Sequence, residues 1–486
     1  MRSDSCIFGT DGIRGFAFGE KINPISCVKI ATAFCMALED CKKKHNKISK
    51  KNSVVTGKKS SKKALKIIIA QDSRESCMPM YNAIIAGITG YGCDVIDYGT
   101  VHIGVISASI ISNSLECVDG AIMISASHNP YHDNGLKFFD SFGCKINNEI
   151  REEIVKYLNI LNFGWKMPFN GIGSVKKLSV TVAVKTYLSF LKSKPLFFKI
   201  NKNSFRNIKI VVDCANGATS FVANHIFGSI GIKPILINNS PNGVNINMRC
   251  GVMNPISAKQ AVISNSADFG FCFDGDGDRI LVIDEKGKIV EGEKFLASLS
   301  LGLKNNNKLY NLSKSIVTTI ASNSCLKQYL TKNDFDVFEC EVGDGFVLEN
   351  MIKEGSNLGG EESGHVILKD ILPVSDGFVS AVAFLRIVLN SKQTVSSIVI
   401  EPKLASYKKF NIDCLHSIDS NSKIMLNRLQ EKYKLAFREK GHFDTKIIIR
   451  PSGTEKKIRI YIESENNEFL QQVAQNVKEE ILKVIM

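Results

Sequence analysis

The stretch FDGDGDR at residues 273–279 decides how this 486-residue sequence is interpreted. Asp274, Asp276 and Asp278 occupy every second position, so their carboxylates project to the same side of an extended backbone. The glycines between them let that backbone wrap closely around an ion. Neighbouring carboxylates are unfavourable unless a cation neutralises them, and hard oxygen ligands select Mg²⁺ or Ca²⁺.

An EF-hand calcium loop is the alternative for this stretch, because Glu285 falls at the twelfth position when Asp274 is the first. The sixth position, where an EF-hand needs glycine, holds Arg279. The flanks FGFCF (269–273) and ILVID (280–284) have the composition of strands and not of helices. We therefore predict a magnesium site between two strands.

Outward from this loop, short β-branched runs alternate with polar loops and amphipathic stretches through most of the chain. The predicted strands are 65–70, 120–124, 208–212, 233–237, 269–273 and 280–283. This alternation is typical of α/β layers, in which the loops at strand ends hold the chemistry.

The pattern changes beyond residue 404, where a helix at 422–439, strands at 446–450 and 457–462, and an amphipathic helix from 468 predict a smaller α+β domain. We expect domains at 1–178, 179–285, 286–403 and 404–486.

The composition is that of an ordinary globular protein, with 44% hydrophobic and 23% charged residues. The fourteen cysteines form no CxxC pair, which argues against zinc-ribbon and thioredoxin-type sites. No uninterrupted apolar stretch predicts a membrane span, and the first residues have no signal-peptide core, so we expect a cytoplasmic protein.

The net charge of +14 is concentrated in one segment, because residues 41–66 contain eleven lysines and no acidic residue. We predict a solvated Lys-rich insertion, a loop, at 41–66. A nucleic-acid-binding arm is the alternative, and we do not expect it because neither arginine nor aromatic residues interleave with the lysines.

A second informative segment, ISASHNP at 124–130, leaves a predicted strand through an Asn-Pro turn. Ser127 in this turn is placed to act as a nucleophile or to carry a phosphate, and His128 and Lys137 could supply donors or move a proton. A serine hydrolase is a rival interpretation, but no Gly-x-Ser-x-Gly elbow accompanies the serine.

Three further loops are polar and rich in glycine. RPSGTE at 450–455 offers a guanidinium, two hydroxyls and exposed backbone, which suit a phosphate. FGTDGIRG at 8–15 and GGEESGH at 359–365 could each be no more than a turn.

Together and in this order, the five segments resemble the α-D-phosphohexomutase superfamily, and most of all its bacterial branch that acts on glucosamine phosphates. VVDCANGA (211–218), PNGVNINMRCG (241–251) and DNGLKFF (133–139) support the resemblance. It extends over nearly the whole chain and leaves only the Lys-rich insertion clearly outside.

The resemblance implies three similar α/β domains and a smaller C-terminal α+β domain around a central active-site cleft. The implied reaction moves a phosphate between the 6- and 1-hydroxyls of a hexosamine phosphate through a bisphosphorylated intermediate. Ser127 would be the phosphoserine, and its phosphate with Asp274, Asp276 and Asp278 would hold Mg²⁺. The implied sugar-binding and phosphate-binding residues are Glu361, Ser363, Arg450, Ser452, Gly453 and Thr454.

The chemistry of phosphoryl transfer fits these residues, since it depends on positioning and charge neutralisation. Arg14, Arg279 and Lys137 could neutralise the transferring group, and Lys137 and His365 are the candidates for proton transfer. A phosphomannomutase or phosphoglucomutase of the same superfamily is the alternative function. The sequence does not fix the oligomeric state, and a homodimer is compatible with it.

The chain departs from the usual family pattern in four places. VHIG (101–104) replaces a proline-rich loop, VGDG (342–345) lacks the common basic residue after Gly-Asp, VSDG (374–377) stands where Thr-Gly-Asp-Gly is usual, and Lys456 stands where proline is usual. None of these departures removes a residue assigned to chemistry.

Overall fold

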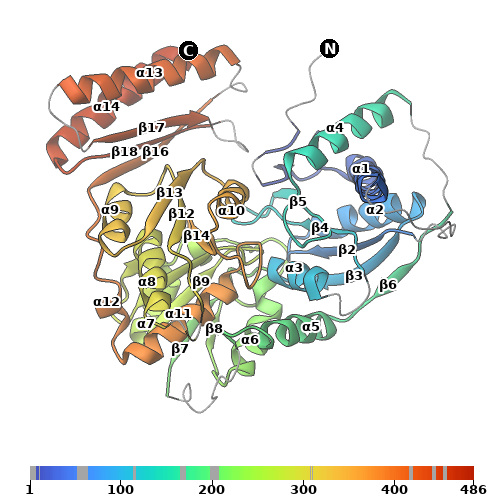
Figure 1. Ribbon diagram of the computed structural model, residues 1–486, viewed down its shortest axis with the longest axis horizontal. Coiled ribbons are helices and arrows are strands. Elements are labelled where there is room, and N and C mark those ends of the chain that lie inside the picture. The colour runs from blue at the N-terminus through green and yellow to red at the C-terminus, as the bar shows by residue number, and fades with distance from the viewer. Residues whose placement is uncertain are drawn as a thin grey trace.

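A computed structural model shows how the chain is arranged (Figure 1). It describes residues 7–9, 11–51, 64–112, 117–164, 171–197, 207–306, 308, 310–414, 420–439, 445–451 and 457–485. Four sheets follow one another along the sequence. Among the described residues, no helix has both the length and the apolar character needed to cross a membrane.

The first sheet has six strands in the order β1-β5-β4-β2-β3-β6. Its elements are β1 (Ile13–Phe16), α1 (Pro24–Lys51), β2 (Lys66–Gln71), α2 (Cys77–Gly90), β3 (Asp94–Thr100), α3 (Ile103–Ser112), β4 (Gly120–Ile124), β5 (Asp133–Phe139), α4 (Asn148–Phe163), β6 (Val175–Lys177) and α5 (Val180–Lys192). Both faces are buried, because Ile67 and Ile69 of β2 pack with α1, α2 and α4 whereas Ile68 and Ala70 pack with α3 and α5.

The second sheet has five strands in the order β11-β10-β9-β7-β8, and the third has four in the order β13-β12-β14-β15. The elements of the second are β7 (Ile210–Asp213), α6 (Ala223–Ser229), β8 (Ile235–Ile237), α7 (Ile256–Ser264), β9 (Phe269–Phe273), β10 (Ile280–Asp284) and β11 (Ile289–Val290). Those of the third are α8 (Gly292–Lys304), β12 (Ser315–Thr319), α9 (Ser324–Lys332), β13 (Asp336–Cys340), α10 (Asp344–Lys353), β14 (Leu358–Gly360), β15 (Val366–Leu368), α11 (Gly377–Ser391) and α12 (Val395–Ile398).

These three sheets share one four-strand pattern. In each, the first strand of the pattern pairs in parallel with the second and third, and the fourth returns antiparallel beside the third. The pattern is β2-β3-β4-β5 in the first sheet, β7-β8-β9-β10 in the second and β12-β13-β14-β15 in the third. The loop between the third and fourth strands contains Ser127, the Asp triplet and Glu361 respectively. Equivalent loops of three similar units thus supply the polar motifs.

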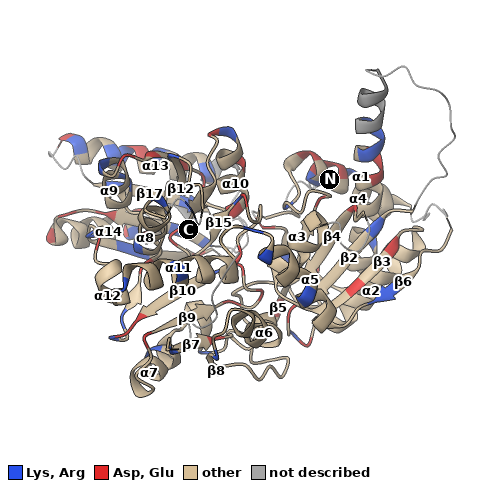
Figure 2. Ribbon diagram, turned by 60° about the horizontal axis from the view of Figure 1, so that its bottom comes forward, with Lys and Arg blue, Asp and Glu red and all other residues tan. Residues whose placement is uncertain are grey.

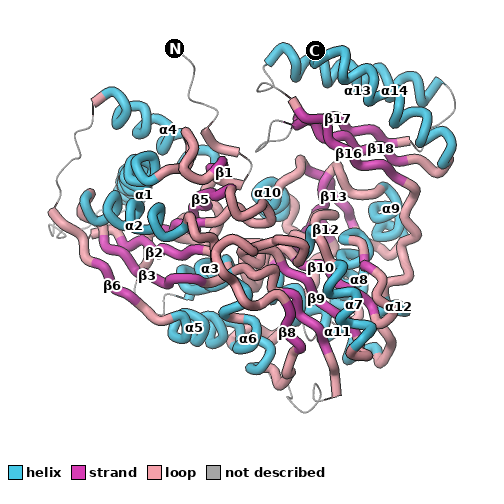
Figure 3. The backbone as a smooth tube through the Cα atoms, turned by 180° about the vertical axis from the view of Figure 1, so that it is seen from behind, coloured by secondary structure: helices cyan, strands magenta, loops and turns pink. Residues whose placement is uncertain are grey.

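The fourth sheet is small and antiparallel, in the order β16-β18-β17, and α13 and α14 cover it (Figures 1 and 3). Its elements are β16 (Tyr407–Asp413), α13 (Ser420–Glu439), β17 (Lys446–Pro451), β18 (Lys457–Glu463) and α14 (Asn467–Ile485). This unit has a hydrophobic core of its own, whereas one continuous core runs through the first three. It meets the third unit at a small cluster of Ala321, Ile448 and Tyr461.

The predicted fold class, three similar α/β units and a smaller α+β unit, is confirmed. The predicted strands 120–124 and 269–273 match β4 and β9 residue for residue, and the other predicted strands agree within two residues. The stretch FDGDGDR joins two antiparallel strands, so the EF-hand alternative is wrong. The prediction missed β16, whose side chains alternate in exposure and include a single buried residue, Ile412.

The prediction of a loop at 41–66 is wrong for residues 41–51, which form the end of α1 (Figure 2). Two of its lysines have acidic partners: Lys42 lies 2.5 Å from Asp119, and Lys44 lies 3.0 Å from Glu153 of α4. Residues 52–63 of the predicted Lys-rich insertion lie outside the described residues.

Candidate active site

Ser127 lies at the turn between β4 and β5 and is completely buried. Its backbone has a φ of 52°, and its N–H donates to Ser125 Oγ at 2.8 Å, so the chain leaves the strand direction at this point. The Ser127 hydroxyl donates a hydrogen bond of 2.5 Å to Asp274 Oδ2 and lies 3.4 Å from His128 Nδ1. The loops of the first and second sheets therefore meet at this hydroxyl.

Two residues that the sequence analysis did not single out hold the serine loop in place. Arg74 donates from Nη2 to the carbonyls of Ser127 at 3.0 Å and Asn129 at 2.8 Å. Asn247 donates from Nδ2 to the same two carbonyls at 2.8 and 3.0 Å. Arg74 comes from the first unit and Asn247 from the second, so the loop is fixed from both sides.

The three carboxylates of the Asp loop are all fully buried, and one oxygen of each lies within 4.8 Å of the others. Lys137 of β5 is their main cationic partner, with Nζ 2.6 Å from Asp278 and 2.8 Å from Asp276. The same ammonium lies 3.0 Å from Asp11, which also contacts Arg14 and Lys145. The cluster is thus a buried network of carboxylates and cations.

The three carboxylates differ in their pKa. Burial, and then the charges of Asp278 and Asp276, raise the pKa of Asp274 to about 8. Burial and Asp278 likewise raise the pKa of Asp276, although the Lys137 ammonium lies 2.8 Å from its Oδ2. Burial opposes the charge on Asp278, yet Lys137 and His365 hold its pKa well below the ordinary value. Three buried carboxylates on one loop are the hard oxygen ligands that a divalent cation prefers, so this ligand set fits Mg²⁺.

A second group, Asp278, Asp344 and His365, also brings three metal-binding side chains together. Lys145 Nζ lies 2.6 Å from Asp344 and 3.9 Å from Asp278, so the Lys145 ammonium already neutralises part of the negative charge of this group. The contact links the first unit to the N-terminus of α10 in the third unit.

Glu361, Ser363 and His365 lie on the equivalent loop of the third sheet. Glu361 accepts hydrogen bonds from Gly343 N at 2.6 Å and Ser363 Oγ at 3.2 Å, and His365 Nδ1 lies 2.6 Å from the same carboxylate. On its other side, His365 Nε2 lies 3.3 Å from Asp278 Oδ1 and 3.1 Å from Arg279 Nε. This loop therefore contacts the Asp loop directly.

The basic groups of the cluster have pKa values shifted in opposite directions. Burial lowers the pKa of His365, but Asp278 and Glu361 more than offset this and raise it to about 10. Burial also opposes the charge on Lys137, yet Asp11, Asp276 and Asp278 hold its pKa well above the ordinary value. Burial and the charges of Arg279 and Arg14 hold the pKa of His128 well below its ordinary value.

Arg450 lies near the end of β17, where it is paired in register with Arg459 of β18. Burial and the charge of Arg459 lower its pKa, while Glu362 and Glu361 act in the opposite direction. Two arginines opposite each other in a sheet repel, which an anion between them would relieve. Ser452, Gly453 and Thr454 of the predicted phosphate cradle lie outside the described residues.

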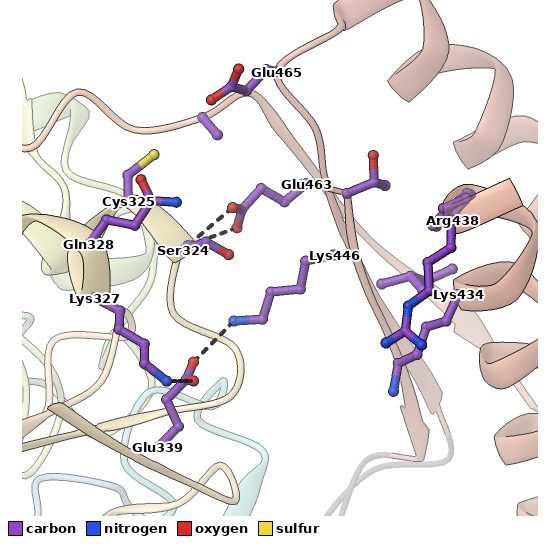
Figure 4. Close-up of a pocket in the computed structure, with 14 residues that line it drawn as sticks. Ser324, Cys325, Lys327, Gln328, Glu339, Lys434, Arg438, Lys446, Glu463 and Glu465 are labelled. Atoms are coloured by element: carbon purple, nitrogen blue, oxygen red, sulfur yellow. Dashed lines mark hydrogen bonds and ion pairs between the residues drawn. The ribbon is translucent and has the colours of Figure 1, made fainter. Parts of the chain in front are cut away.

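A separate pocket of about 430 Å³ lies between the third and fourth units (Figure 4). Glu463 of β18 accepts from the backbone N–H of Ser324 at the start of α9, and Lys446 of β17 lies 3.4 Å from Glu339. None of the predicted site residues lines this pocket. Its polar contacts are part of the attachment of the small C-terminal unit.

Family models match all four units. The matches are to the phosphoglucomutase/phosphomannomutase alpha/beta/alpha domains I at residues 47–163, II at 185–287 and III at 291–404, and to the C-terminal domain at 434–480. The chain belongs to this family of phosphohexomutases.

Curated relatives match over nearly the full length. The phosphoglucosamine mutase of Aliarcobacter butzleri is 37% identical over 476 residues, covering 97% of this chain and 98% of that protein. The phosphoglucosamine mutase of Helicobacter pylori is 36% identical over 477 residues, with the same coverage. A solved phosphoglucomutase/phosphomannomutase family protein from Burkholderia thailandensis has a TM-score of 0.75 at 21% identity, covering 100% of this chain and 98% of that one, and shows the same fold.

Proposed function

We propose that this protein is a phosphoglucosamine mutase, which interconverts glucosamine 6-phosphate and glucosamine 1-phosphate. The observation that carries the proposal is the buried Ser127 hydroxyl, held at a turn against Asp274 of the Asp loop. Relatives with that name, similar over 97% of the chain, supply the substrate class.

The proposed reaction begins with a phosphate on Ser127. The bond from phosphorus to the serine oxygen breaks, a bond from phosphorus to a sugar hydroxyl oxygen forms, and the proton of the sugar hydroxyl is transferred to the serine oxygen that phosphorus leaves. The bisphosphorylated sugar then reorients in the site. Its other phosphate is transferred to Ser127, and the proton moves in the reverse direction. Catalysis of such a transfer rests on positioning and charge neutralisation.

Residues from the loops of all three α/β units surround the serine. Lys137 and His365 are the candidates for proton transfer, and both contact Asp278, at 2.6 and 3.3 Å. Arg14 and Arg279 neutralise the transferring phosphate, and His128 lies beside the serine. Glu361 and Ser363 bind sugar hydroxyls, exchanging their present mutual hydrogen bond for the substrate.

Mg²⁺ would be held by Asp274, Asp276 and Asp278 together with the Ser127 phosphate. When bound, the ion neutralises charge on the phosphate. The Lys137 ammonium, which contacts two of these carboxylates, limits their repulsion and keeps the loop in position.

The distal phosphate is assigned to Arg450, Ser452, Gly453 and Thr454 on the small C-terminal unit. The register pairing of Arg450 with Arg459 supports an anion site there. A gripping loop on a unit with its own core would let the intermediate reorient without escaping.

We place the protein in the cytoplasm, acting on small molecules rather than on nucleic acid. We also propose domain divisions at 1–178, 179–285, 286–403 and 404–486. Within this proposal the boundary at 285 moves to Val290, because β11 pairs with β10 and the family match to domain III begins at residue 291.

The test is a side-by-side assay of glucosamine 6-phosphate, mannose 6-phosphate and glucose 6-phosphate with Mg²⁺ and the matching bisphosphate activator. We expect the highest kcat/KM for the glucosamine substrate. A higher value for either of the other sugars would assign the protein to the phosphomannomutase or phosphoglucomutase activity instead. Turnover of none of the three would contradict the mutase proposal.

A further inference from the structure

Two segments in which the chain departs from the usual family pattern lie against each other behind the Asp loop. They are residues 102–104, just before and at the start of α3, and residues 375–377, at the start of α11. His102 Nε2 lies 3.6 Å from Asp376 Oδ2, and both side chains are buried. The segments are distant in sequence and belong to the first and third units.

Both segments bind the backbone of the Asp loop at three consecutive carbonyls. Ile103 N donates to the carbonyl of Asp276 at 3.0 Å, and Gly377 N donates to that of Gly277 at 3.0 Å. Ser375 Oγ donates to the carbonyl of Asp278 at 2.6 Å. Each donor is His102's or Asp376's immediate neighbour in sequence. The carboxylates of the loop face Ser127 and Lys137, so the two segments support the loop from its backbone side.

Asp376 connects the two segments. Its Oδ1 caps α11 by accepting from Phe378 N at 2.8 Å and Val379 N at 3.1 Å. Its Oδ2 accepts a 2.7 Å hydrogen bond from the hydroxyl of Tyr187 on α5 and faces His102. A Cβ at Gly104 would lie 1.7 Å from Oδ2, so only glycine at 104 lets the carboxylate reach this position.

His102 is fixed by packing rather than by hydrogen bonds. Its ring makes edge-on contacts with Tyr187 at 4.9 Å and Phe378 at 4.8 Å between ring centroids. Neither ring nitrogen has a hydrogen-bond partner in the described part of the chain, although the side chain is completely buried. A buried polar ring without partners costs folding free energy. A small shift toward Asp376 would close the bond at Nε2.

We infer that residues 102–104 and 375–377, tied together by Tyr187 and Asp376, form a clamp that positions the Asp loop for Mg²⁺. Tyr187, His102 and Asp376 are positioning residues, since they act through the loop backbone and touch neither substrate nor metal. Mutation of groups that orient metal ligands from behind typically lowers metal affinity by about 10- to 100-fold. The inference rests on the proposed function only in taking the Asp loop as the metal site.

The test measures Mg²⁺ binding directly, by calorimetric titration of the metal-stripped full chain. Tyr187→Phe removes the hydroxyl that binds Asp376, and His102→Ala removes the ring that packs against Tyr187 and Phe378. Tyr91→Phe is the matched control, because it removes a hydroxyl that donates to Glu39 at 2.6 Å in the first unit, away from the Asp loop.

We expect the dissociation constant for Mg²⁺ to rise roughly tenfold in Tyr187→Phe and His102→Ala, and to stay at the wild-type value in Tyr91→Phe. KM for glucosamine 6-phosphate, measured at saturating Mg²⁺, should not change in either clamp variant. A purely structural role would lower the melting temperature of Tyr187→Phe and Tyr91→Phe alike and leave Mg²⁺ affinity unchanged.

If the clamp variants that fold bind Mg²⁺ with wild-type affinity, and the wild-type protein shows normal mutase turnover, the clamp is wrong and the proposed function stands. If the wild-type protein binds no Mg²⁺, both the clamp and the metal site are wrong. Turnover of mannose or glucose phosphates with weakened Mg²⁺ binding in the variants would support the clamp and change only the substrate.

Discussion

The Ser127 hydroxyl donates a 2.5 Å hydrogen bond to Asp274, a carboxylate whose pKa burial and its acidic neighbours raise to about 8. A phosphate on this serine brings roughly −1.5 to −2 further charges to a site that already holds three buried carboxylates. The phosphate and a divalent cation should therefore favour each other's presence, and this coupling must be reciprocal. The serine loop and the Asp loop form one functional unit.

Ser127→Ala should abolish phosphate transfer, because no other hydroxyl occupies that position. Ser125 is the matched control: its Oγ accepts from the backbone of Ser127, so it faces inward and cannot receive the phosphate. Phosphopeptide mapping of active protein should find the modification at Ser127 and retain it in Ser125→Ala. An unmodified Ser127, in protein whose activity needs no bisphosphate activator, would contradict the mechanism.

Asp276→Asn should weaken Mg²⁺ binding and lower turnover severely while leaving the fold intact. The carboxylate lies 2.8 Å from the Lys137 ammonium, and the amide can still face Lys137 through its oxygen, so the fold should survive at reduced stability. Removing the phosphate from Ser127 should also weaken Mg²⁺ binding, by about 5- to 150-fold. Calorimetry with Mg²⁺ before and after phosphatase treatment, with intact mass as the check on occupancy, measures both effects. Asp268→Asn, at an exposed site, is the control.

Lys137→Met should destabilise the protein by about 3–5 kcal/mol in the absence of divalent metal, because it leaves buried carboxylates without their cation. Mg²⁺ should recover part of this loss by supplying positive charge to the same carboxylates. Thermal melts in EDTA and in Mg²⁺ compare the stability lost with and without the metal. Lys44→Met, which removes an exposed ion pair with Glu153, is the control. An equal loss in both buffers would show that Lys137 and the metal serve different carboxylates.

Much of the fold could be predicted from local sequence, because its strands are buried. The all-apolar runs of β4 and β9 were predicted residue for residue, whereas β16 escaped because its side chains alternate in exposure. The lysines at the end of α1 suggested a loop, since the sequence does not reveal that Asp119 and Glu153 pair with them.

The part of the candidate site that lies in local sequence motifs could be predicted. Ser127 and the Asp triplet were found from spacing and residue type, and the structure brings them together. The contacts of Arg74 and Asn247 with the serine loop, and of His102 with Asp376, join segments of different units. Such long-range contacts follow from the packing of whole sheets and leave no signal in local spacing.

Asp140→Asn should stabilise the protein above pH 6. Burial raises the pKa of Asp140 to about 6, although its carboxylate accepts from Phe142 N and Cys144 N at 2.9 and 3.0 Å. The folded state then binds this proton more tightly than the unfolded state, so the contribution to stability falls as pH rises from about 4 to about 6. The full difference is at most about 3 kcal/mol.

Chemical denaturation of wild type and Asp140→Asn at several pH values tests this, since the asparagine keeps both backbone hydrogen bonds but does not titrate. The two curves should separate between pH 4 and 6 and run parallel above it. A constant difference across that range would show that Asp140 is ionised throughout.

Arg450→Lys should raise KM for the sugar phosphate and increase escape of the bisphosphorylated intermediate. A guanidinium offers phosphate a planar fork of donors, which an ammonium cannot reproduce. Burial beside Arg459 makes this position costly for a cation without an anionic partner, so the arginine is retained where a phosphate would compensate it.

The measurement is steady-state KM together with release of labelled bisphosphate during turnover. Arg428→Lys on the exposed face of α13 is the control and should change neither quantity. In the proposed mechanism the chemical step takes place at Ser127, so transfer of phosphate from the serine to a bound sugar should continue in Arg450→Lys, while a smaller share of the intermediate should go on to product. Unchanged KM with unchanged release would show that residues other than Arg450 hold the distal phosphate.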